Sequence, residues 1–243
     1  MKLYYDSEKA NKLQNMIYDE WDSTKNEVDP THRVEYHNEK RGKECHISDV
    51  IYCPMKRFCR TINCEEKITR QSVGMMLFGI VAQKILQWMF PEEQCEYNSV
   101  ISNIVEGHID VFEELEYPLE IKASRKKIYG KEQLPKEWMR QLISYLAMEG
   151  KHKGWIIILN VVNMELSAWC IELTNDEIFN QLIDITNTVN IQEKAIIEKN
   201  YGLLSIHPSE FTYCSYRYSC PRRMECKQRV EKKEQLKKIK PLD

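Results

Sequence analysis

The sequence predicts a mixed α/β fold, in which helices cover both faces of a mixed central sheet as an α/β/α sandwich. Three observations lead to this prediction. The expected elements follow one another as a helix, three strands, a helix, two strands and a helix. The strands are short apolar stretches, whereas the helices carry apolar residues at a period of about 3.6. Of the 243 residues, 42% are hydrophobic, which is sufficient for a buried core.

Several stretches have the apolar spacing or the capping residues of helices. Apolar residues recur at helical spacing near the N-terminus, at Leu13, Met16, Ile17 and Trp21. Ser48 is a candidate N-cap for a short helix, and Thr174 is one for a long helix that continues to about Asn200. Between them, apolar faces predict helices over residues 71–90 and 135–150.

Five apolar stretches are predicted to be strands. They cover residues 96–104, 107–112, 117–122, 154–162 and 165–173. The fourth stretch is apolar almost throughout, so we expect it to be buried on both faces of the sheet. The fifth alternates between apolar and polar residues, so we expect it to form an edge strand.

The composition divides the chain into three segments. Residues 1–44 hold the N-terminal helix and a polar loop, residues 45–205 hold the core, and residues 206–243 hold clustered cysteines and a basic tail. No apolar run is long enough to cross a membrane, and the N-terminus does not resemble a signal peptide. These features predict a cytoplasmic protein with no membrane partner. The net charge of -2 does not by itself indicate nucleic-acid binding.

The residues with the clearest chemical potential lie on two neighbouring predicted strands. Asp110 is near the end of one strand, and Glu120 and Lys122 are on the next. Residues two apart on a strand face the same side, so Glu120 and Lys122 project together, and Asp110 can join them. Two carboxylates suit Mg2+ or Mn2+, which activates water and stabilises charge on a phosphate. The alternative is a surface hairpin with a cross-strand charge pair.

Positive charge and polar helix residues follow this hairpin. Arg125, Lys126 and Lys127 form a basic run beside the predicted cation site, where a phosphate backbone would need positive charge. The alternative is a solvated charge run. On the next predicted helix, Gln141 and Tyr145 are one turn apart and present two polar groups together. The alternative for this pair is a helix face with a packed tyrosine.

Nine cysteines in a chain predicted to be cytoplasmic indicate metal ligands rather than disulfides. Six of them form an early and a late group, namely Cys53, Cys59 and Cys64, and Cys214, Cys220 and Cys226. The late trio lacks one ligand for a four-thiolate site, and Cys53 can supply it. Zinc and an iron–sulfur cluster both fit four thiolates. Because the sequence has no CxxC pair, which zinc usually prefers, a [4Fe-4S] cluster is favoured.

Together these motifs resemble those of the RecB-like branch of the PD-(D/E)XK nucleases. Within that branch the sequence looks most like the fourth CRISPR-associated (Cas) protein family, iron–sulfur exonucleases with relatives in phages and archaeal viruses. The resemblance covers roughly residues 45–230. The matching motifs are Ser48-Asp-Val-Ile-Tyr-Cys53-Pro, Gly107-His-Ile-Asp110, Glu120-Ile-Lys122, Gln141-x-x-x-Tyr145 and the three late cysteines.

The resemblance implies a restriction-endonuclease-like core with an iron–sulfur region that joins the N- and C-terminal segments. It also implies a metal-dependent exonuclease that acts on single-stranded DNA ends, with the CRISPR integrase complex as a partner in spacer acquisition. One alternative is a RecB-type phage or DNA-repair nuclease with no CRISPR role. Another is a non-catalytic iron–sulfur adaptor that binds DNA.

The resemblance assigns a role to each site residue. It implies that Asp110, Glu120 and the Ile121 carbonyl bind Mn2+ or Mg2+, and that Lys122 is catalytic. DNA contacts near the scissile phosphate are implied for two residues of the following helix, Gln141 and Tyr145. The implied cluster ligands are Cys53, Cys214, Cys220 and Cys226.

Two features depart from the family pattern. Where the family helix usually carries a metal-binding His, four residues after a Gly, this sequence has Gln83. Its amide oxygen is an acceptable ligand for a hard cation but a poorer one for a transition metal. The late cysteines of the family are commonly spaced two and then five residues apart, whereas both gaps here hold five residues. Cys59 or Cys64 is therefore an alternative to one of the late three.

Overall fold

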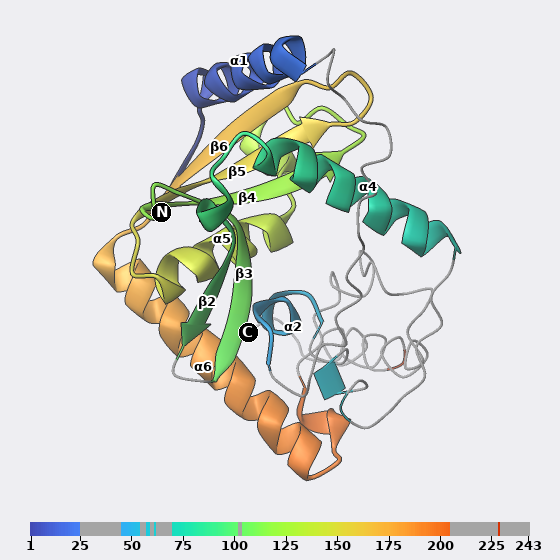
Figure 1. Ribbon diagram of the computed structural model, residues 1–243. Coiled ribbons are helices and arrows are strands. Elements are labelled where there is room, and N and C mark those ends of the chain that lie inside the picture. Colours follow the sequence, from blue (N-terminus) through green and yellow to red (C-terminus); the bar gives the residue numbers. More distant parts are fainter. Residues whose placement is uncertain are drawn as a thin grey trace, which may run out of the picture.

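The structure is a computed structural model of the chain. It describes residues 1–24, 45–53, 57–58, 61, 70–101, 104–204 and 228. The described part contains a six-stranded sheet with helices packed against both of its faces (Figure 1). The predicted mixed α/β class is therefore confirmed.

The sheet has the spatial order β1-β6-β5-β4-β3-β2. In chain order its strands are β1 (Lys2–Tyr5), β2 (Cys95–Ile101), β3 (Val105–Glu113), β4 (Tyr117–Ser124), β5 (Lys153–Asn160) and β6 (Leu166–Glu172). β4 and β5 run parallel, and the other neighbouring strands in this order run antiparallel, so the sheet is mixed as predicted. A helix connects the parallel pair, as such a crossover requires.

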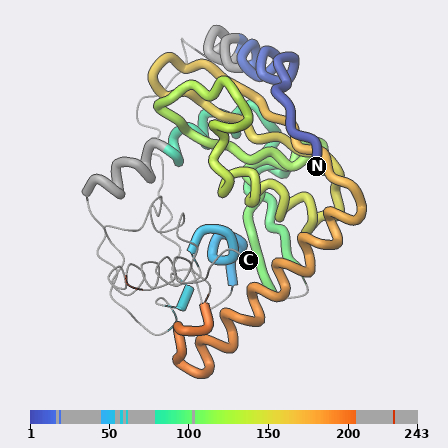
Figure 2. The backbone as a smooth tube through the Cα atoms, turned by 180° about the vertical axis from the view of Figure 1, so that it is seen from behind, coloured from blue at the N-terminus to red at the C-terminus, as the bar shows by residue number. Residues whose placement is uncertain are grey.

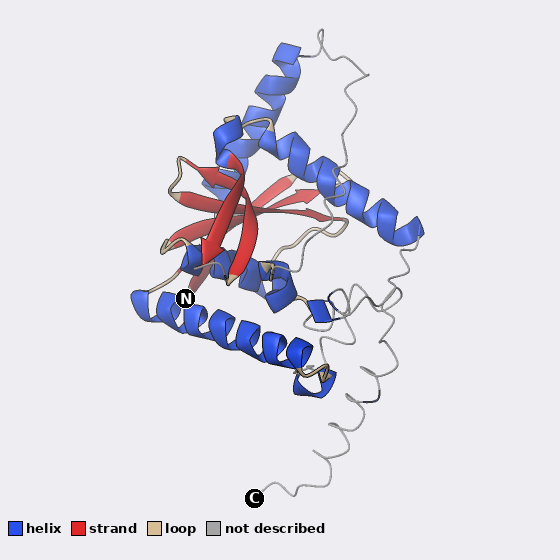
Figure 3. Cartoon of the chain, turned by 60° about the horizontal axis from the view of Figure 1, so that its bottom comes forward, coloured by secondary structure: helices blue, strands red, loops and turns tan. Residues whose placement is uncertain are grey.

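The helices lie on both sides of the sheet. The described α-helices are α1 (Ser7–Thr24), α2 (Ile47–Ile51), α4 (Arg70–Gln87), α5 (Lys136–Met148) and α6 (Asn175–Ile197). Short 3-10 turns are η1 (Glu92–Gln94), η2 (Lys131–Gln133) and η3 (Tyr201–Leu203). Figure 3 shows α1 and α4 on one face of the sheet and α5 and α6 on the other. These layers are compatible with the predicted sandwich.

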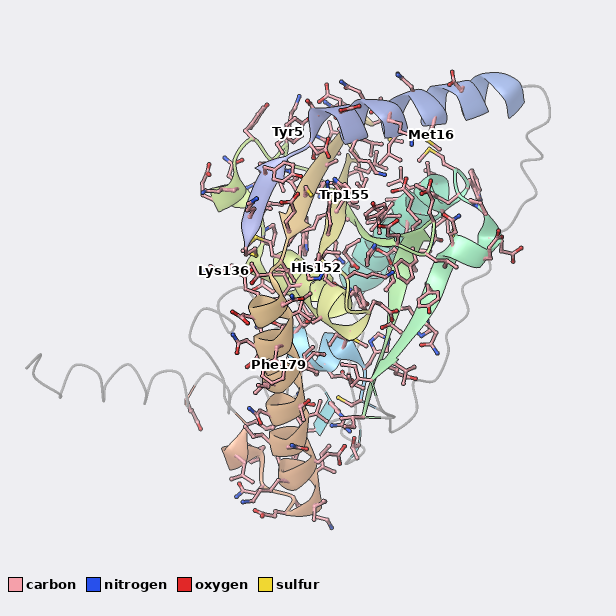
Figure 4. The ribbon with its side chains drawn as sticks, turned by 90° about the vertical axis from the view of Figure 1, so that its left-hand side faces the viewer. Tyr5, Met16, Lys136, His152, Trp155 and Phe179 are labelled. Atoms are coloured by element: carbon pink, nitrogen blue, oxygen red, sulfur yellow. The ribbon has the colours of Figure 1, made fainter. Side chains whose placement is uncertain are left out.

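β5 illustrates how the sequence produces two cores. Trp155 and Ile157 pack toward α1 and α4, whereas Ile156 and Ile158 pack toward α5 and α6. All four side chains are buried, as expected for a strand that is apolar almost throughout. Figure 4 labels Trp155 together with Met16 of α1, which packs against the same core.

The prediction that β6 forms an edge of the sheet is wrong. β1 pairs with β6 antiparallel, from Lys2–Glu172 to Tyr5–Trp169, and forms the edge itself. Figure 2 shows this N-terminal strand running along the side of the sheet and leading into α1. β1 is only four residues long and mostly exposed. A segment this short and polar carries too little apolar alternation to be recognised as a strand.

The start of α2 also differs from the prediction, because His46 rather than Ser48 is its N-cap. The His46 side chain accepts a hydrogen bond from the Ser48 N–H, and the His46 N–H donates to the Asp49 carboxylate at 3.2 Å. A parallel bridge between His46 and Glu106 holds the start of this helix against β3. At α6, by contrast, Thr174 is the N-cap that the sequence predicts.

Parts of the predicted organisation lie outside the described residues. These parts are the polar loop before residue 45, and the C-terminal segment apart from residue 228. Among the helices that are described, none combines the length and the low polarity needed to cross a membrane.

Candidate active site

The pairing between β3 and β4 ends immediately before the predicted catalytic carboxylates. The ladder runs from Glu113–Tyr117 to Val111–Leu119. One step further, an Asp110 carboxylate oxygen replaces the backbone partner and accepts a hydrogen bond from the Ile121 N–H at 2.7 Å. The backbone carbonyl of Asp110 accepts a hydrogen bond from the Gln87 amide, also at 2.7 Å. Side chains therefore satisfy these two backbone groups.

Glu120 and Lys122 face away from the core formed with α1 and α4. Their neighbours Leu119 and Ile121 pack into that core, so the alternation of β4 turns Glu120 and Lys122 toward α5. Glu120 is only 1% exposed, and one of its oxygens is paired with the Lys122 ammonium. The other oxygen is buried and has no hydrogen-bond partner among the described residues. An unpaired buried carboxylate oxygen is costly, which makes this atom the clearest sign of a missing ligand.

α5 and the end of α2 supply the next layer of the site. The Lys122 ammonium donates to the Gln141 amide oxygen at 3.0 Å, and the Tyr52 hydroxyl donates to the same oxygen at 2.6 Å. The Gln141 amide nitrogen in turn donates to the Tyr145 hydroxyl at 3.3 Å. Tyr145 is 1% exposed, so the structure places it beneath Gln141 rather than at the surface. This chain of hydrogen bonds fixes the position of the lysine.

Gly107 allows Tyr145 to reach this position. A Cβ added at Gly107 would lie 2.7 Å from the Tyr145 ring and 2.8 Å from the Ile47 side chain. Those distances are too short for any side chain, so β3 needs a glycine where α2 and α5 approach it. The glycine at the start of the Gly-His-Ile-Asp motif therefore has a packing role in the site.

Burial and like charge set the electrostatics of the carboxylates. Desolvation raises the pKa of Asp110 well above its usual range, and the Glu120 carboxylate raises it further. Desolvation also raises the pKa of Glu120, against the lowering effect of the Lys122 ammonium. For Lys122, desolvation lowers the pKa, but attraction to Glu120, Tyr52 and Asp110 outweighs it and the net pKa is raised. The lysine thus stays charged, and the two carboxylates are left short of positive charge.

Gln83 reaches the site through a residue that the sequence did not indicate, Glu96. The Gln83 amide nitrogen donates to Glu96 at 2.7 Å, and the Gln87 amide nitrogen donates to the same oxygen at 3.2 Å. Sequence reasoning assigned no role to Glu96, Gln87 or Tyr52. Glu96 and Gln87 lie in no recognisable chemical motif, and the motif that contains Tyr52 assigned no role to it. The register of β2 against β3 is what brings Glu96 to Asp110.

The donor set fits a hard divalent cation. As the side chains stand, no group of three or more His, Cys, Asp or Glu residues within the described ranges is arranged to hold a metal. The oxygens on offer are instead the carboxylates of Asp110 and Glu120 together with neutral amide and backbone oxygens, which Mg2+ and Mn2+ accept. The unpaired Glu120 oxygen is the atom that such an ion would satisfy.

The predicted basic run follows β4 as an exposed loop. Arg125, Lys126 and Lys127 are all exposed, next to the strand that carries Glu120. Lys127 forms an ion pair with Glu165 at 2.6 Å, which raises the lysine pKa and takes up part of its charge. Arg125 and Lys126 therefore carry most of the uncompensated charge of this loop.

Of the four predicted cluster ligands, only Cys53 lies within the described residues. Cys214, Cys220 and Cys226 lie outside them, as do the alternatives Cys59 and Cys64. Cys53 follows α2 and packs against a small apolar cluster that contains Phe58, Ala195 and Leu204. Leu204 of this cluster precedes Cys214 by ten residues in the sequence.

Comparisons with known proteins do not assign a family. No family model matches the chain, and no curated protein does. Among solved structures, the chain is similar to the crystal structure of SSO0001, with 14% sequence identity and a TM-score of 0.44. The likeness covers 86% of this chain and 96% of that one.

Proposed function

We propose that this protein is a Mg2+- or Mn2+-dependent deoxyribonuclease that hydrolyses phosphodiester bonds at single-stranded DNA ends. The observation that carries the proposal is the Glu120 carboxylate, which is buried, keeps one oxygen unpaired and faces both Asp110 and Lys122. A surface hairpin with a charge pair, the alternative considered for the sequence, would leave these groups in solvent. Burying them is worthwhile only if a ligand balances the charge.

The cation would be held by Asp110 and Glu120, with the Ile121 carbonyl as a further oxygen ligand. When bound, it would activate a water molecule and stabilise charge on the phosphate. The protein contributes rigid placement: Asp110 is fixed by the Ile121 N–H, and Glu120 is fixed by its burial and by Lys122. Preorganised charges of this kind account for much of the rate enhancement in phosphoryl transfer.

Lys122 is the residue placed to act on the water or the phosphate. An ammonium has three N–H donors, and two of them are used by Glu120 and Gln141. The third is available to a phosphate oxygen or to the attacking water. Gln141 is a positioning residue for this lysine, because its oxygen accepts from both Lys122 and Tyr52. Tyr145 supports Gln141 from below.

The proposal includes the finer features that the sequence resemblance implies. These are a restriction-endonuclease-like sandwich, a [4Fe-4S] cluster on Cys53, Cys214, Cys220 and Cys226, and DNA processing for CRISPR spacer acquisition with the integrase complex. The location of Cys53 beside Leu204 supports the cluster, since Cys214 follows only ten residues later. Ten extended residues span about 36 Å at most, so the length of the chain permits Cys214 to approach Cys53.

Mn2+-dependent cleavage of single-stranded DNA tests the proposed function. Asp110→Asn and Glu120→Gln are expected to lower the rate at least 1,000-fold, because each removes a charged ligand of the cation. Glu116→Gln is the matched control, because Glu116 is exposed in the turn between the same two strands. This variant should cleave at the rate of the parent. Undiminished cleavage by either site variant would place the active site elsewhere. An adaptor without catalytic activity would show no cleavage even in the parent.

Metal analysis of protein purified without oxygen tests the cluster. We expect brown protein with about four irons per chain. Cys53→Ala should lose iron, whereas Cys95→Ala and Cys170→Ala should keep it. Cys170 is buried in β6, and Cys95 donates to the Gln87 carbonyl, so each has a structural place of its own. Stoichiometric zinc without iron would contradict the cluster but leave the cation site untouched.

A further inference from the structure

Glu96 lies in one row with the two predicted catalytic carboxylates. In the β2–β3 ladder Cys95 pairs with Val111 and Tyr97 with Ile109, which places Glu96 opposite Asp110. In the β3–β4 ladder Val111 pairs with Leu119, so the next step places Asp110 opposite Glu120. Each of the three adjacent strands therefore carries a carboxylate next to the last β3–β4 pair.

The backbone of Glu96 is unusual at this point. Its φ is 51°, in the left-handed region that residues other than glycine rarely adopt, and Glu96 itself is not part of the ladder that its two neighbours form. Backbone strain of this kind is common at functional sites. The Glu96 side chain accepts hydrogen bonds from α4.

Three donors of α4 hold one oxygen of the Glu96 carboxylate. The amide nitrogens of Gln83 and Gln87 lie 2.7 Å and 3.2 Å from it, and the Lys84 ammonium lies 3.4 Å from it. All three contact Oε1, and no described donor contacts Oε2.

Gln87 gives a second, independent indication of a ligand. Its amide nitrogen bridges Glu96 and the Asp110 carbonyl, while its amide oxygen is buried with no hydrogen-bond partner among the described residues. The residue is only 4% exposed, so bulk water does not compensate for this oxygen. A buried neutral amide oxygen without a donor, on the amide group whose nitrogen bridges Glu96 and the Asp110 carbonyl, is a suitable ligand for a hard cation.

We infer that Glu96 is a third carboxylate ligand for the divalent cation, and that the buried Gln87 oxygen takes part in the same site. This inference rests on the proposed cation site at Asp110 and Glu120. Gln83 is then a positioning residue, which holds Glu96 through Oε1 and leaves Oε2 for the metal. The sequence predicted Gln83 itself as a ligand; the geometry gives it an indirect role through Glu96.

Mn2+ binding to the full-length protein tests the inference without reference to cleavage. Free Mn2+ is measured by electron paramagnetic resonance during titration of each variant. Glu96→Gln is expected to weaken binding at least tenfold. Glutamine keeps an oxygen for the donors of α4, so the contact between α4 and β2 is retained. Glu93→Gln is the matched control, because Glu93 is exposed and lies three residues before Glu96. The Mn2+ affinity of this variant should be within twofold of that of the parent.

A shorter side chain at position 96 distinguishes direct ligation of Mn2+ from attraction by the charge of Glu96. Glu96→Asp keeps the charge but withdraws the carboxylate by one methylene group. If Glu96 is a ligand, this variant also binds Mn2+ several-fold more weakly than the parent. If it binds like the parent while Glu96→Gln is weakened, Glu96 acts through its charge alone and the inference is overturned.

The failure of the inference and the failure of the proposed function give different results. Parental Mn2+ affinity in Glu96→Gln, together with lost affinity in Asp110→Asn, would remove Glu96 from the site and leave the nuclease proposal standing. If all three variants, Asp110→Asn, Glu120→Gln and Glu96→Gln, bound Mn2+ with the affinity of the parent, no cation would bind at this site. The inference about Glu96 and the proposed function would then both be wrong.

Discussion

The two sides of β4 differ in how they are paired. On one side β5 follows it without interruption, from Leu119–Trp155 to Ser124–Asn160. On the other side β3 follows it only from Glu113–Tyr117 to Val111–Leu119. Figure 1 shows β3 and β2 turning away from the other strands beyond this point. A single strand thus has a closed edge and an edge that opens at Glu120.

The closed side and the open side bury different kinds of side chain. Toward β5 the strand takes part in apolar cores on both faces, which is how a parallel pair is normally stabilised. On the open side Asp110 and Gln87 replace ladder hydrogen bonds, and two buried oxygens have no partner among the described residues. The apolar packing of β4 is thus continuous on the β5 side, whereas both buried carboxylate and amide oxygens without a partner among the described residues lie on the open side.

The largest effect is expected on the open side, from Lys122→Met. Loss of the ammonium should lower Mn2+-dependent cleavage about 1,000-fold, or about 4 kcal/mol, because the charge acts on the water or the phosphate. Mn2+ binding should be kept or strengthened, since the variant removes a cation that competes for Glu120. Lys194→Met, on an exposed part of α6, is the control for the loss of a lysine. Equal loss of cleavage and of Mn2+ binding would instead make Lys122 part of the metal site.

On the closed side the expected effect is on stability alone. Ile157 is 1% exposed in the core between β5 and the helices α1 and α4, so Ile157→Ala should lower the free energy of unfolding by about 3 kcal/mol. Urea denaturation measures this loss. Ile191→Ala is the matched control, because Ile191 on α6 is 47% exposed and its truncation should change stability by less than about 0.5 kcal/mol. A small effect at Ile157 would mean that this side of the sheet is not the stabilising one.

Gly107 lies in β3, on the open side of β4, and its substitution should affect both stability and the site. A methyl group at Gly107 would overlap Tyr145 and Ile47, so Gly107→Ala should destabilise the protein by about 2 kcal/mol and displace the support of Gln141. Gly79→Ala provides the contrast within α4. No atom is found within 4 Å of a Cβ added there, so alanine should be neutral or stabilising by up to about 1 kcal/mol. Equal effects of the two changes on unfolding would contradict the close approach of α5 to β3.

The closed side was largely predictable from the sequence, because its signals are local. The apolar run of β5, the period of the helices and the Thr174 cap each depend on a few neighbouring residues. The same locality explains why Glu120 and Lys122 could be placed together: residues two apart on a strand share a face whatever the rest of the fold does. To predict that Asp110 lies beside them, it was enough to assume that two consecutive strands pair.

The remaining site residues depend on contacts between distant segments. Glu96 meets Asp110 because of the register of β2 on β3, and Tyr52 meets Gln141 across 89 residues of sequence. Gln87 serves the site through a backbone carbonyl, which no side-chain motif reveals. β1 was missed for a similar reason, since its four residues become a strand only by pairing with β6. Local patterns do not encode such tertiary choices.

The smallest expected effect concerns the stability of the metal-free protein. Asp110→Asn should raise its free energy of unfolding at neutral pH by about 1 kcal/mol. Burial and the Glu120 charge raise the pKa of Asp110 above the value of about 3.9 that it has in the unfolded chain. Asparagine removes this charge, keeps an oxygen for the Ile121 N–H and leaves the pair of Glu120 and Lys122 intact. Asp184→Asn, an exposed change on α6, should leave stability unchanged.

The pH dependence of the free energy of unfolding, compared between the parent and Asp110→Asn, tests the direction of this effect. Between the unfolded and folded pKa values of Asp110, the folded protein binds more protons than the unfolded chain, so the stability of the parent falls as pH rises through this interval. Asp110→Asn should reduce that slope. Saturating Mn2+ should make the parent more stable than Asp110→Asn. The cation stabilises the parent by binding its ionised site, whereas the variant binds the cation weakly and gains much less stability from it. A parent that is more stable than Asp110→Asn without metal, at every pH above 4, would mean that the open side of β4 needs no cation to balance its charge.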